Sequence, residues 1–487
     1  MVSAAARCSS TIPQLRRCLA AVLFGALVAT ACSADADQTP AAGVPDAEAS
    51  TTTTPDVGDD DVVGNDADGD TSPDSSAEES QPQDSEQDAA GNDDQSVQSA
   101  DLDSVAQLAG QIVRLSDSGS IIVSDPDGGD EVTLDDGSSA QNNQPTWSND
   151  GSRVAWSAVD VNGPRLSISS ATGTDRVDTA APTPAFFLSW SETDAWIAGL
   201  GPGPAGVELF FTDTSNSELS RIGSGQPFYI DWISGEDLVA AVSGQDFVDI
   251  STDVQGPPST RTLEGELGRF QAPAALDADR TVISQSAFLS DDIVIVGPGT
   301  QEQTIASADG PVAFSPNPVS EEIAVLVTRT QPLPEPISAS VSGPLTAQQD
   351  TAPPSLQMGR VSVIDSETAE VTTIDIPEPI AMAWSPDGST LAVLAGDTQQ
   401  GFAWSFARGD QVIDGQRFIP SPTSVSSYLP FADQYDRSST WWSPDSAAFV
   451  FAGSVSGESG VFVDIVEDDL GAARIGDGQI AFWSPAP

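Results

Sequence analysis

One stretch decides the fold of this 487-residue chain: Ala383-Trp384-Ser385-Pro386-Asp387-Gly388-Ser389-Thr390-Leu391-Ala392-Val393-Leu394. Pro386 presets the backbone dihedral φ, Asp387 can accept hydrogen bonds from nearby amides, and Gly388 tolerates a positive φ, so these residues predict a tight turn. The tryptophan before the turn ends one strand. The apolar run after it, Leu391–Leu394, is typical of a strand buried on both faces. The stretch therefore predicts two neighbouring strands joined by a turn.

The same scheme recurs along the chain with a period of about 40 residues, a spacing that marks repeat architectures. Each copy has an aromatic or apolar anchor, a short polar turn and an apolar run. The anchors are Trp147, Trp190, Trp232, Leu276, Phe314, Trp384, Trp442 and Trp483. Between anchors there is room for two more strands, as in Arg360–Ile376, where Val361–Ile364 and Glu370–Ile374 flank a polar turn. Four strands per repeat is the content of one blade of a β-propeller.

The two ends of the repeat region each hold part of a repeat. Ile480–Pro485 begins a copy and then stops, whereas Ile112–Leu134 reads as a copy without its beginning. Joining them closes the ring with one composite blade, which removes the exposed edges of an open sheet. We therefore expect an all-β protein, with an eight-bladed β-propeller over residues 111–487 closed by its N- and C-terminal strands. Seven blades result if the copy at Leu276 is absorbed into its neighbour.

These copies resemble the WD40-like repeat of the TolB-type β-propellers, in which aromatic-Ser-Pro-Asp-Gly is followed by Ile-Ala-Phe or a similar run. The resemblance covers residues 111–487. The copy at Trp384 matches in full, and those at Trp147 and Trp442 are close. The resemblance implies a propeller fold and, by analogy of fold alone, a platform for protein interactions.

The first 31 residues have the layout of a secretory signal peptide. Arg7, Arg16 and Arg17 form a positive region, and the uncharged run Leu19–Thr30 is too short to span about 30 Å of hydrocarbon as a helix. The run leads into Val-Ala-Thr-Ala and then Cys32. That ending resembles the lipobox of bacterial lipoproteins. It implies cleavage before Cys32, a lipid on its thiol, and anchorage on the outer side of the cytoplasmic membrane, in the cell envelope. Ordinary cleavage after Ala-Thr-Ala is the alternative.

Residues 32–110 are predicted to be the lipidated cysteine followed by a disordered acidic linker. From Ser33 to Asp103 the sequence holds 21 acidic residues and no basic or aromatic residue. Such a segment cannot bury enough apolar surface to offset the entropy lost on ordering. In the whole chain 73 acidic residues stand against 17 basic ones, all arginines. The resulting net charge of -56 argues against nucleic acid as a partner.

Histidine is absent, which excludes Ser-His-Asp and Cys-His catalysis and histidine metal ligands. Cleavage before Cys32 would leave a single cysteine, too few for an internal disulfide or a cysteine zinc site. We therefore expect no catalytic residues, no cofactor and no metal site, and a protein that is not an enzyme.

Two intervals between anchors are longer than the repeat needs. Arg329–Met358, rich in Pro, Ser and Gln, is predicted to be a surface excursion. Phe402–Tyr435 is predicted to be a partner-binding loop, since long loops on a rigid scaffold often carry function. Its candidate contact residues are the aromatic side chains of Trp404, Phe406, Phe418, Tyr428 and Tyr435. Trp404 is out of register with the repeat, which makes it the best candidate for stacking on a ligand.

These features favour a monomeric binding or interaction module of the cell envelope, held to the membrane through Cys32, with an envelope protein or a glycan as its partner. Two alternatives stay open. One is a glycan-active enzyme that uses a pair of carboxylates at the channel mouth. The other is a passive envelope spacer, which only the long linker supports.

Overall fold

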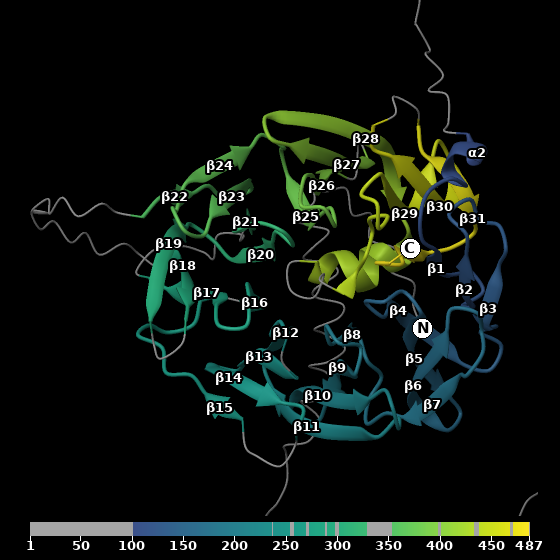
Figure 1. Cartoon of the computed structure of the whole chain (residues 1–487), viewed down its shortest axis with the longest axis horizontal. Helices are drawn as coiled ribbons and strands as arrows, with labels where there is room; N and C mark the ends of the chain where they lie inside the picture. The colour runs from purple at the N-terminus through teal and green to yellow at the C-terminus, as the bar shows by residue number, and fades with distance from the viewer. Residues whose placement is uncertain are drawn as a thin grey trace, which may run out of the picture. The chain divides into compact units, whose positions relative to one another are not determined.

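The computed structural model describes residues 101–486, with gaps at 236, 254–257, 269–271, 288–289, 298–300, 329–352, 398–400, 433–437 and 468–470. Figure 1 shows the sheets of the described part following one another around a ring. The prediction of an all-β propeller is confirmed. The signal peptide, Cys32 and nearly all of the acidic linker lie outside the described residues, as does most of the predicted excursion at 329–358. In the described part, no helix is both long and apolar enough to cross a membrane.

Each sheet consists mainly of consecutive antiparallel strands. The first three complete repeats form β4 (Gln141–Trp147), β5 (Arg153–Asp160), β6 (Gly163–Ser170) and β7 (Val177–Ala180); β8 (Phe187–Trp190), β9 (Trp196–Gly203), β10 (Gly206–Asp213) and β11 (Leu219–Gly225); and β12 (Phe228–Trp232), β13 (Leu238–Ser243), β14 (Asp246–Ser251) and β15 (Ser259–Thr260). The copy at Leu276 has a sheet of its own, so it is not absorbed into its neighbour. That sheet holds β16 (Ala274–Ala275), β17 (Thr281–Ser286), β18 (Asp291–Val296) and β19 (Glu302–Ala308), with β22 (Ser355–Leu356) added in parallel.

The next repeat forms β20 (Val312–Pro316), β21 (Glu322–Val327), β23 (Val361–Asp365) and β24 (Val371–Ile374). A seven-stranded sheet follows, with β25 (Pro379–Trp384), β26 (Leu391–Asp397), β27 (Gly401–Arg408), β28 (Gln411–Pro420), β29 (Ala448–Val455), β30 (Glu458–Ile465) and β31 (Ala473–Gly476). The strand β28 joins its two halves, because its last residues pair with β29 instead of β27.

The ring is closed by strands from the two ends of the repeat region. The composite sheet has the order β3 (Val132–Asp135), β2 (Ile121–Ser124), β1 (Ile112–Leu115) and β32 (Ile480–Trp483). Antiparallel pairing places Ile112 opposite Trp483 and Leu115 opposite Ile480. This confirms that the N- and C-terminal strands share one blade.

Apolar clusters between successive sheets form the core. The structure describes eight such clusters, and one of them lies inside the seven-stranded sheet, between β25–β28 and β29–β31. If that sheet is divided there, the described strands make eight groups. The cluster between the β29–β31 strands and the composite sheet joins Val450 of β29 to Ile112 and Trp483. Burial of apolar surface therefore continues around the ring.

The turn at Ser385–Gly388 has the chemistry that the motif predicts. The Gly388 N–H donates to the Ser385 carbonyl oxygen at 2.8 Å, Gly388 has a φ of +68°, and the Ser385 hydroxyl donates to the Asp387 carboxylate at 2.6 Å. The strands around the turn pair Trp384 with Leu391.

The anchor chosen at Phe314 is wrong by two residues. In that sheet Pro316 pairs with Ile323, in the relation that Trp384 has to Leu391. The reason is that the turn there begins at Asn317, whose N–H donates to the Glu322 carbonyl oxygen at 2.8 Å.

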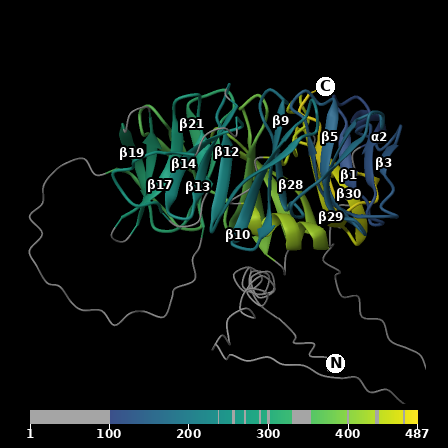
Figure 2. The same ribbon diagram turned by 90° about the horizontal axis from the view of Figure 1, so that it is seen from below.

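The turns that follow the anchors lie on one face of the propeller, which we call the turn face. Both ends of the described chain reach it. A Cβ on Gly110 would come within 3.1 Å of Pro444 in one such turn, and a Cβ on Gly151 in another would come within 3.1 Å of the Ala486 carbonyl oxygen. Figure 2 shows α2 (Leu102–Val105) and the C-terminus toward this face, and a helical segment between β28 and β29 at the opposite face, which we call the mouth face.

Candidate functional site

The inner strand of the last repeat is interrupted. Two separate pieces of chain pair with β29: Ile419–Pro420, opposite Gly453 and Ser454, and Trp442, opposite Phe449. Of the residues between these pieces, the described ones, 421–432 and 438–440, leave the sheet as an insertion. Figure 1 shows its helical part near the middle of the ring. The extra length between the anchors Trp384 and Trp442 therefore builds structure at the channel mouth.

The insertion reaches sheets that are distant in sequence. We call Ser421–Ala432 the plug; it contains the π-helix η2 (Ser424–Tyr428) and the 3-10 turn η3 (Leu429–Phe431). The Phe431 ring stacks on that of Phe186, just before β8, with 6.2 Å between centroids. The Tyr428 ring lies 5.6 Å from that of Phe482 in β32. The plug thus contacts both the composite sheet and the β8–β11 sheet.

Hydrogen bonds tie the start of the plug to Gln479, just before β32. The Ser421 and Ser424 hydroxyls donate to the Gln479 carbonyl oxygen, and the Thr423 hydroxyl donates to the Gln479 side-chain oxygen. The Ser424 N–H donates to the Ser421 hydroxyl at 3.0 Å. These bonds fasten one end of the plug to the strand that closes the ring.

Two small cavities flank the ring of Tyr428. Their free volumes are about 40 Å³ and about 20 Å³, room for at most a few water molecules. Tyr428, Leu429 and Trp441 line both. The first is completed by Leu394, Trp404, Phe418, Pro420, Ser424, Phe451, Ala452, Ile480, Ala481 and Phe482, and the second by Gln144, Phe186, Phe187, Ser427, Phe431, Ala432 and Ser439. Every described lining residue is uncharged.

Tyr428 belongs to the plug, and its hydroxyl is buried. It is shut off from solvent, and the Gln144 backbone N–H contacts it without the geometry of a full hydrogen bond. Burial raises the pKa of Tyr428 well above its ordinary value, and the nearby Gln144 backbone amide counteracts only part of that rise. A buried hydroxyl without a partner is a cost to the folded state.

The prediction of a loop at Phe402–Tyr435 is wrong for the first part of that range, which forms strands. Trp404 and Phe406 lie in β27, and Phe418 lies in β28. All three are buried in the cluster between the two halves of the seven-stranded sheet. The Trp404 ring packs 4.6 Å from that of Phe449 and 5.3 Å from that of Trp441, so its face is used by the core. Tyr435 lies outside the described residues.

The structure brings Tyr428 together with residues that sequence reasoning missed. These are Trp441, Gln144 and Phe186, which line the cavities beside it. Trp441 precedes the anchor Trp442, so a pair of tryptophans at one anchor was an available signal. Gln144 has a φ of +55° at an irregularity in β4, and nothing in its sequence context predicts a contact with the plug.

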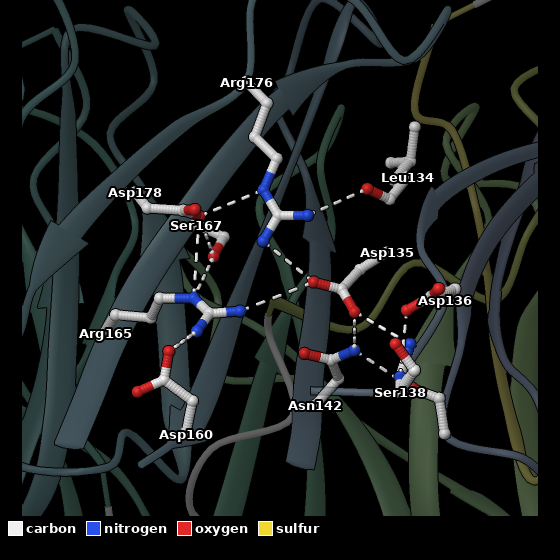
Figure 3. Close-up of polar contacts among 12 residues, drawn as sticks. Leu134, Asp135, Asp136, Ser138, Asn142, Asp160, Arg165, Ser167, Arg176 and Asp178 are labelled. Atoms are coloured by element: carbon white, nitrogen blue, oxygen red, sulfur yellow. Dashed lines mark hydrogen bonds and ion pairs between the residues drawn. The ribbon is translucent and has the colours of Figure 1, made fainter. Parts of the chain in front are cut away.

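A network of charged residues joins the composite sheet to the next one (Figure 3). The Asp135 carboxylate of β3 lies 2.8 Å from Nη2 of Arg176 and 3.5 Å from Nη2 of Arg165. Burial alone would raise the pKa of Asp135, but hydrogen bonds from Asn142, the Gly137 backbone and Arg176 outweigh it and hold the pKa below its ordinary value. The network ties two sheets together.

Among the carboxyl groups of the described residues, that of Asp464 is the one whose pKa is raised. Burial raises it to about 6, against a hydrogen bond from the Gln416 N–H at 2.9 Å. The residue lies within the sheet, in β30, rather than at the channel mouth where the glycan-active alternative places its carboxylate pair. Across the described ranges, no three acidic or cysteine side chains are grouped to hold a metal ion.

The sequence matches no protein-family model and no curated protein. Solved structures similar to the chain include dihydro-heme d1 dehydrogenase NirN in complex with DHE. The identity is 12% and the TM-score 0.51, over 78% of this chain and 76% of that one. At this identity the likeness shows the fold alone.

Two further solved structures have lower scores. One is TolB from Acinetobacter baumannii, at 13% identity and a TM-score of 0.33 over 56% of this chain and 65% of that one. The other is the β-propeller domain of the Trilobed protease from Pyrococcus furiosus, at 12% identity and a TM-score of 0.41 over 70% of this chain and 96% of that domain.

Proposed function

We propose that this protein is a cell-envelope lipoprotein, tethered through Cys32, whose propeller binds an envelope partner on its mouth face. The observation that carries the proposal is the opposite placement of two features. The described chain enters the propeller at the turn face, where Gly110 lies against Pro444, and the plug, Ser421–Ala432, lies at the mouth face. The first described residues therefore do not cover the mouth face, where we place the partner.

The signal-peptide pattern and the acidic linker support the envelope location. The partner class follows from the surface chemistry of the mouth. The plug and the cavities beside it present aromatic, aliphatic and hydroxyl groups without charge, as expected for a protein-binding surface. The net charge of -56 on the whole chain favours a partner with a neutral or basic contact surface.

Two exposed aliphatic residues make a matched test. Ile419 is 64% exposed at the mouth-face end of β28, and Val319 is 65% exposed in a turn on the opposite face. A photo-crosslinking amino acid is placed at each position in turn, in cells, and the adducts are identified by mass spectrometry. We expect one dominant protein adduct from position 419 and none from position 319.

The same experiment with Cys32→Ser tests the tether. We expect the adduct at position 419 to fall with the loss of membrane attachment. Adducts of equal yield from both positions would contradict the mouth-face site. No reproducible adduct from either position would contradict a protein partner, and the glycan ligand or the passive spacer would then replace it.

A further inference from the structure

The plug interrupts the inner strand of the last repeat. Strands β4 and β25 pair with their neighbours as continuous segments, whereas the inner side of β29 is paired by two separate segments, Ile419–Ser421 and Trp441–Ser443. The chain between these pieces forms a π-helix, a rare geometry that is frequent at functional sites. The plug can therefore move without the sheets coming apart, because its two ends rejoin the same strand.

We call the site around the Tyr428 ring, lined by Trp404, Trp441 and Phe482, the seat. It is neither fully packed nor fully hydrogen-bonded. The Tyr428 hydroxyl makes no hydrogen bond of full geometry in the described structure, and free volume remains on both sides of its ring. The start of the plug is fastened by polar contacts, through Ser421, Thr423 and Ser424 to Gln479, and its end packs through Phe431 on Phe186. An aromatic group without a hydroxyl would fill this seat at a lower desolvation cost than Tyr428 does.

The residues that line the seat favour an uncharged aromatic group as its occupant. Trp404, Trp441 and Phe482 line it, and they belong to strands or to the inner-strand segment rather than to the plug. The described lining carries no charge, although the chain as a whole has a net charge of -56. An uncharged aromatic group gains from apolar burial and ring packing there, whereas an ionised group would be left without a partner.

We propose that Tyr428 is a displaceable stopper: its ring occupies a ligand site in the closed protein and leaves that site when the ligand binds. When the plug leaves the mouth, the seat of the Tyr428 ring takes an uncharged aromatic group of the ligand. The proposal rests on the mouth-face binding function and deepens it, since it names the group that is recognised. In this arrangement the closed plug lowers the apparent affinity in proportion to the closed fraction of the protein.

The test uses the full chain carrying Cys32→Ser, which keeps lipid out of the assay, and the uncharged fluorophore N-phenyl-1-naphthylamine as the probe. We expect saturable binding to the parent protein and an affinity raised by about tenfold in Tyr428→Ala, because the stopper is gone. Tyr428→Phe keeps the ring and removes the unsatisfied hydroxyl, so the affinity should fall below that of the parent. The pair Ser421→Ala with Ser424→Ala should raise the affinity, and Ser426→Ala, in the same segment but not bonded to Gln479, should leave it unchanged.

Hydrogen–deuterium exchange separates displacement from binding elsewhere. Saturating probe should speed exchange of residues 421–432 in the parent protein, and Trp441→Ala should lose the fluorescence signal. Unchanged or slower exchange of the plug, or no probe binding to any variant, would overturn the proposal. Both measurements on the parent and on Tyr428→Phe stand even if Tyr428→Ala does not fold. Probe binding without a crosslink at position 419 would support the displacement of Tyr428 and would contradict only the proposal of a protein partner.

Discussion

The indole Nε1 of Trp147 donates a hydrogen bond to the carbonyl oxygen of Phe482, 3.1 Å away and 335 residues later in the chain. The same bond recurs around the ring, from five of the six anchor tryptophans to the inner strand of the preceding repeat, whereas the Trp483 Nε1 donates to the Ala109 carbonyl oxygen at 2.8 Å. The further donors and acceptors are Trp190 and Thr146, Trp232 and Ser189, Trp384 and Ser315, and Trp442 and Ala383. The sheet of β16 has no anchor tryptophan, and there the Ala275 N–H donates to the Asp231 carboxylate at 2.7 Å. The repeated aromatic residue therefore joins neighbouring blades as well as filling the core.

Trp147→Phe should loosen the closing seam of the ring. It keeps an aromatic ring but leaves the Phe482 carbonyl without this donor, which should lower the free energy of unfolding by about 1–2 kcal/mol. Urea unfolding measures the loss, and hydrogen exchange should show faster opening of β1–β3. Trp384→Phe removes the corresponding bond at another seam and should leave exchange of β1–β3 unchanged. Equal exchange of β1–β3 in both variants would contradict a local seam.

Gly388→Ala should destabilise the protein more than Gly409→Ala. Both glycines have positive φ, +68° and +56°, which costs an alanine about 1–2 kcal/mol. A Cβ at position 388 would also meet the Asn317 side-chain oxygen at 2.3 Å, whereas a Cβ at 409 meets nothing within 4 Å. Thermal unfolding of the two variants should therefore differ, with the lower Tm in Gly388→Ala. Equal Tm values would show that the turn relaxes freely.

Arg176→Gln should weaken the protein in a pH-dependent way. The pKa of Asp135 is lowered in the folded state, so this carboxylate contributes stability above its unfolded pKa of about 3.8, and the contribution is lost as pH falls through the folded pKa. We expect a loss of about 1–2 kcal/mol at pH 7 that shrinks below pH of about 4. Arg360→Gln is the control, since its partner Asp375 is 95% exposed and such a pair contributes little. A loss that does not change with pH would exclude Asp135 as its source.

Asp464→Asn should stabilise the protein at pH 7. The pKa of Asp464 is raised by burial to about 6, so the stability linked to its protonated form is present below about pH 4 and lost as pH rises through about 6. The neutral amide avoids that loss and keeps an oxygen that accepts from the Gln416 N–H. We expect a gain of at most about 3 kcal/mol at pH 7 that disappears near pH 4. Urea unfolding across this range measures it, and a gain of the same size at both pH values would point to packing instead.

Much of the fold could be predicted because its signals are local. The turn chemistry of Ser385–Gly388 and the apolar run after it involve residues next to one another, and their repetition along the chain predicts a ring of sheets. The composite blade also followed, since Ile480–Pro485 and Ile112–Leu134 each lack what the other supplies. The alternation of Phe402, Trp404 and Phe406 at every second residue is a strand signal of the same local kind, and it outweighs the length of the interval that predicts a loop there.

The candidate site depended on contacts that no local pattern contains. The register at Pro316 rather than Phe314 was decided by the backbone pairing with Ile323. The excess length before Trp442 indicated an insertion, but its course across the mouth depends on Phe186 and Phe482, which come from other sheets. By itself the sequence determined the repeating blade, the closing strands and the charge of the chain, because neighbouring residues specify turns and strands. The tertiary structure alone decided that the Tyr428 hydroxyl is buried, because burial depends on which distant surfaces the closed ring brings together.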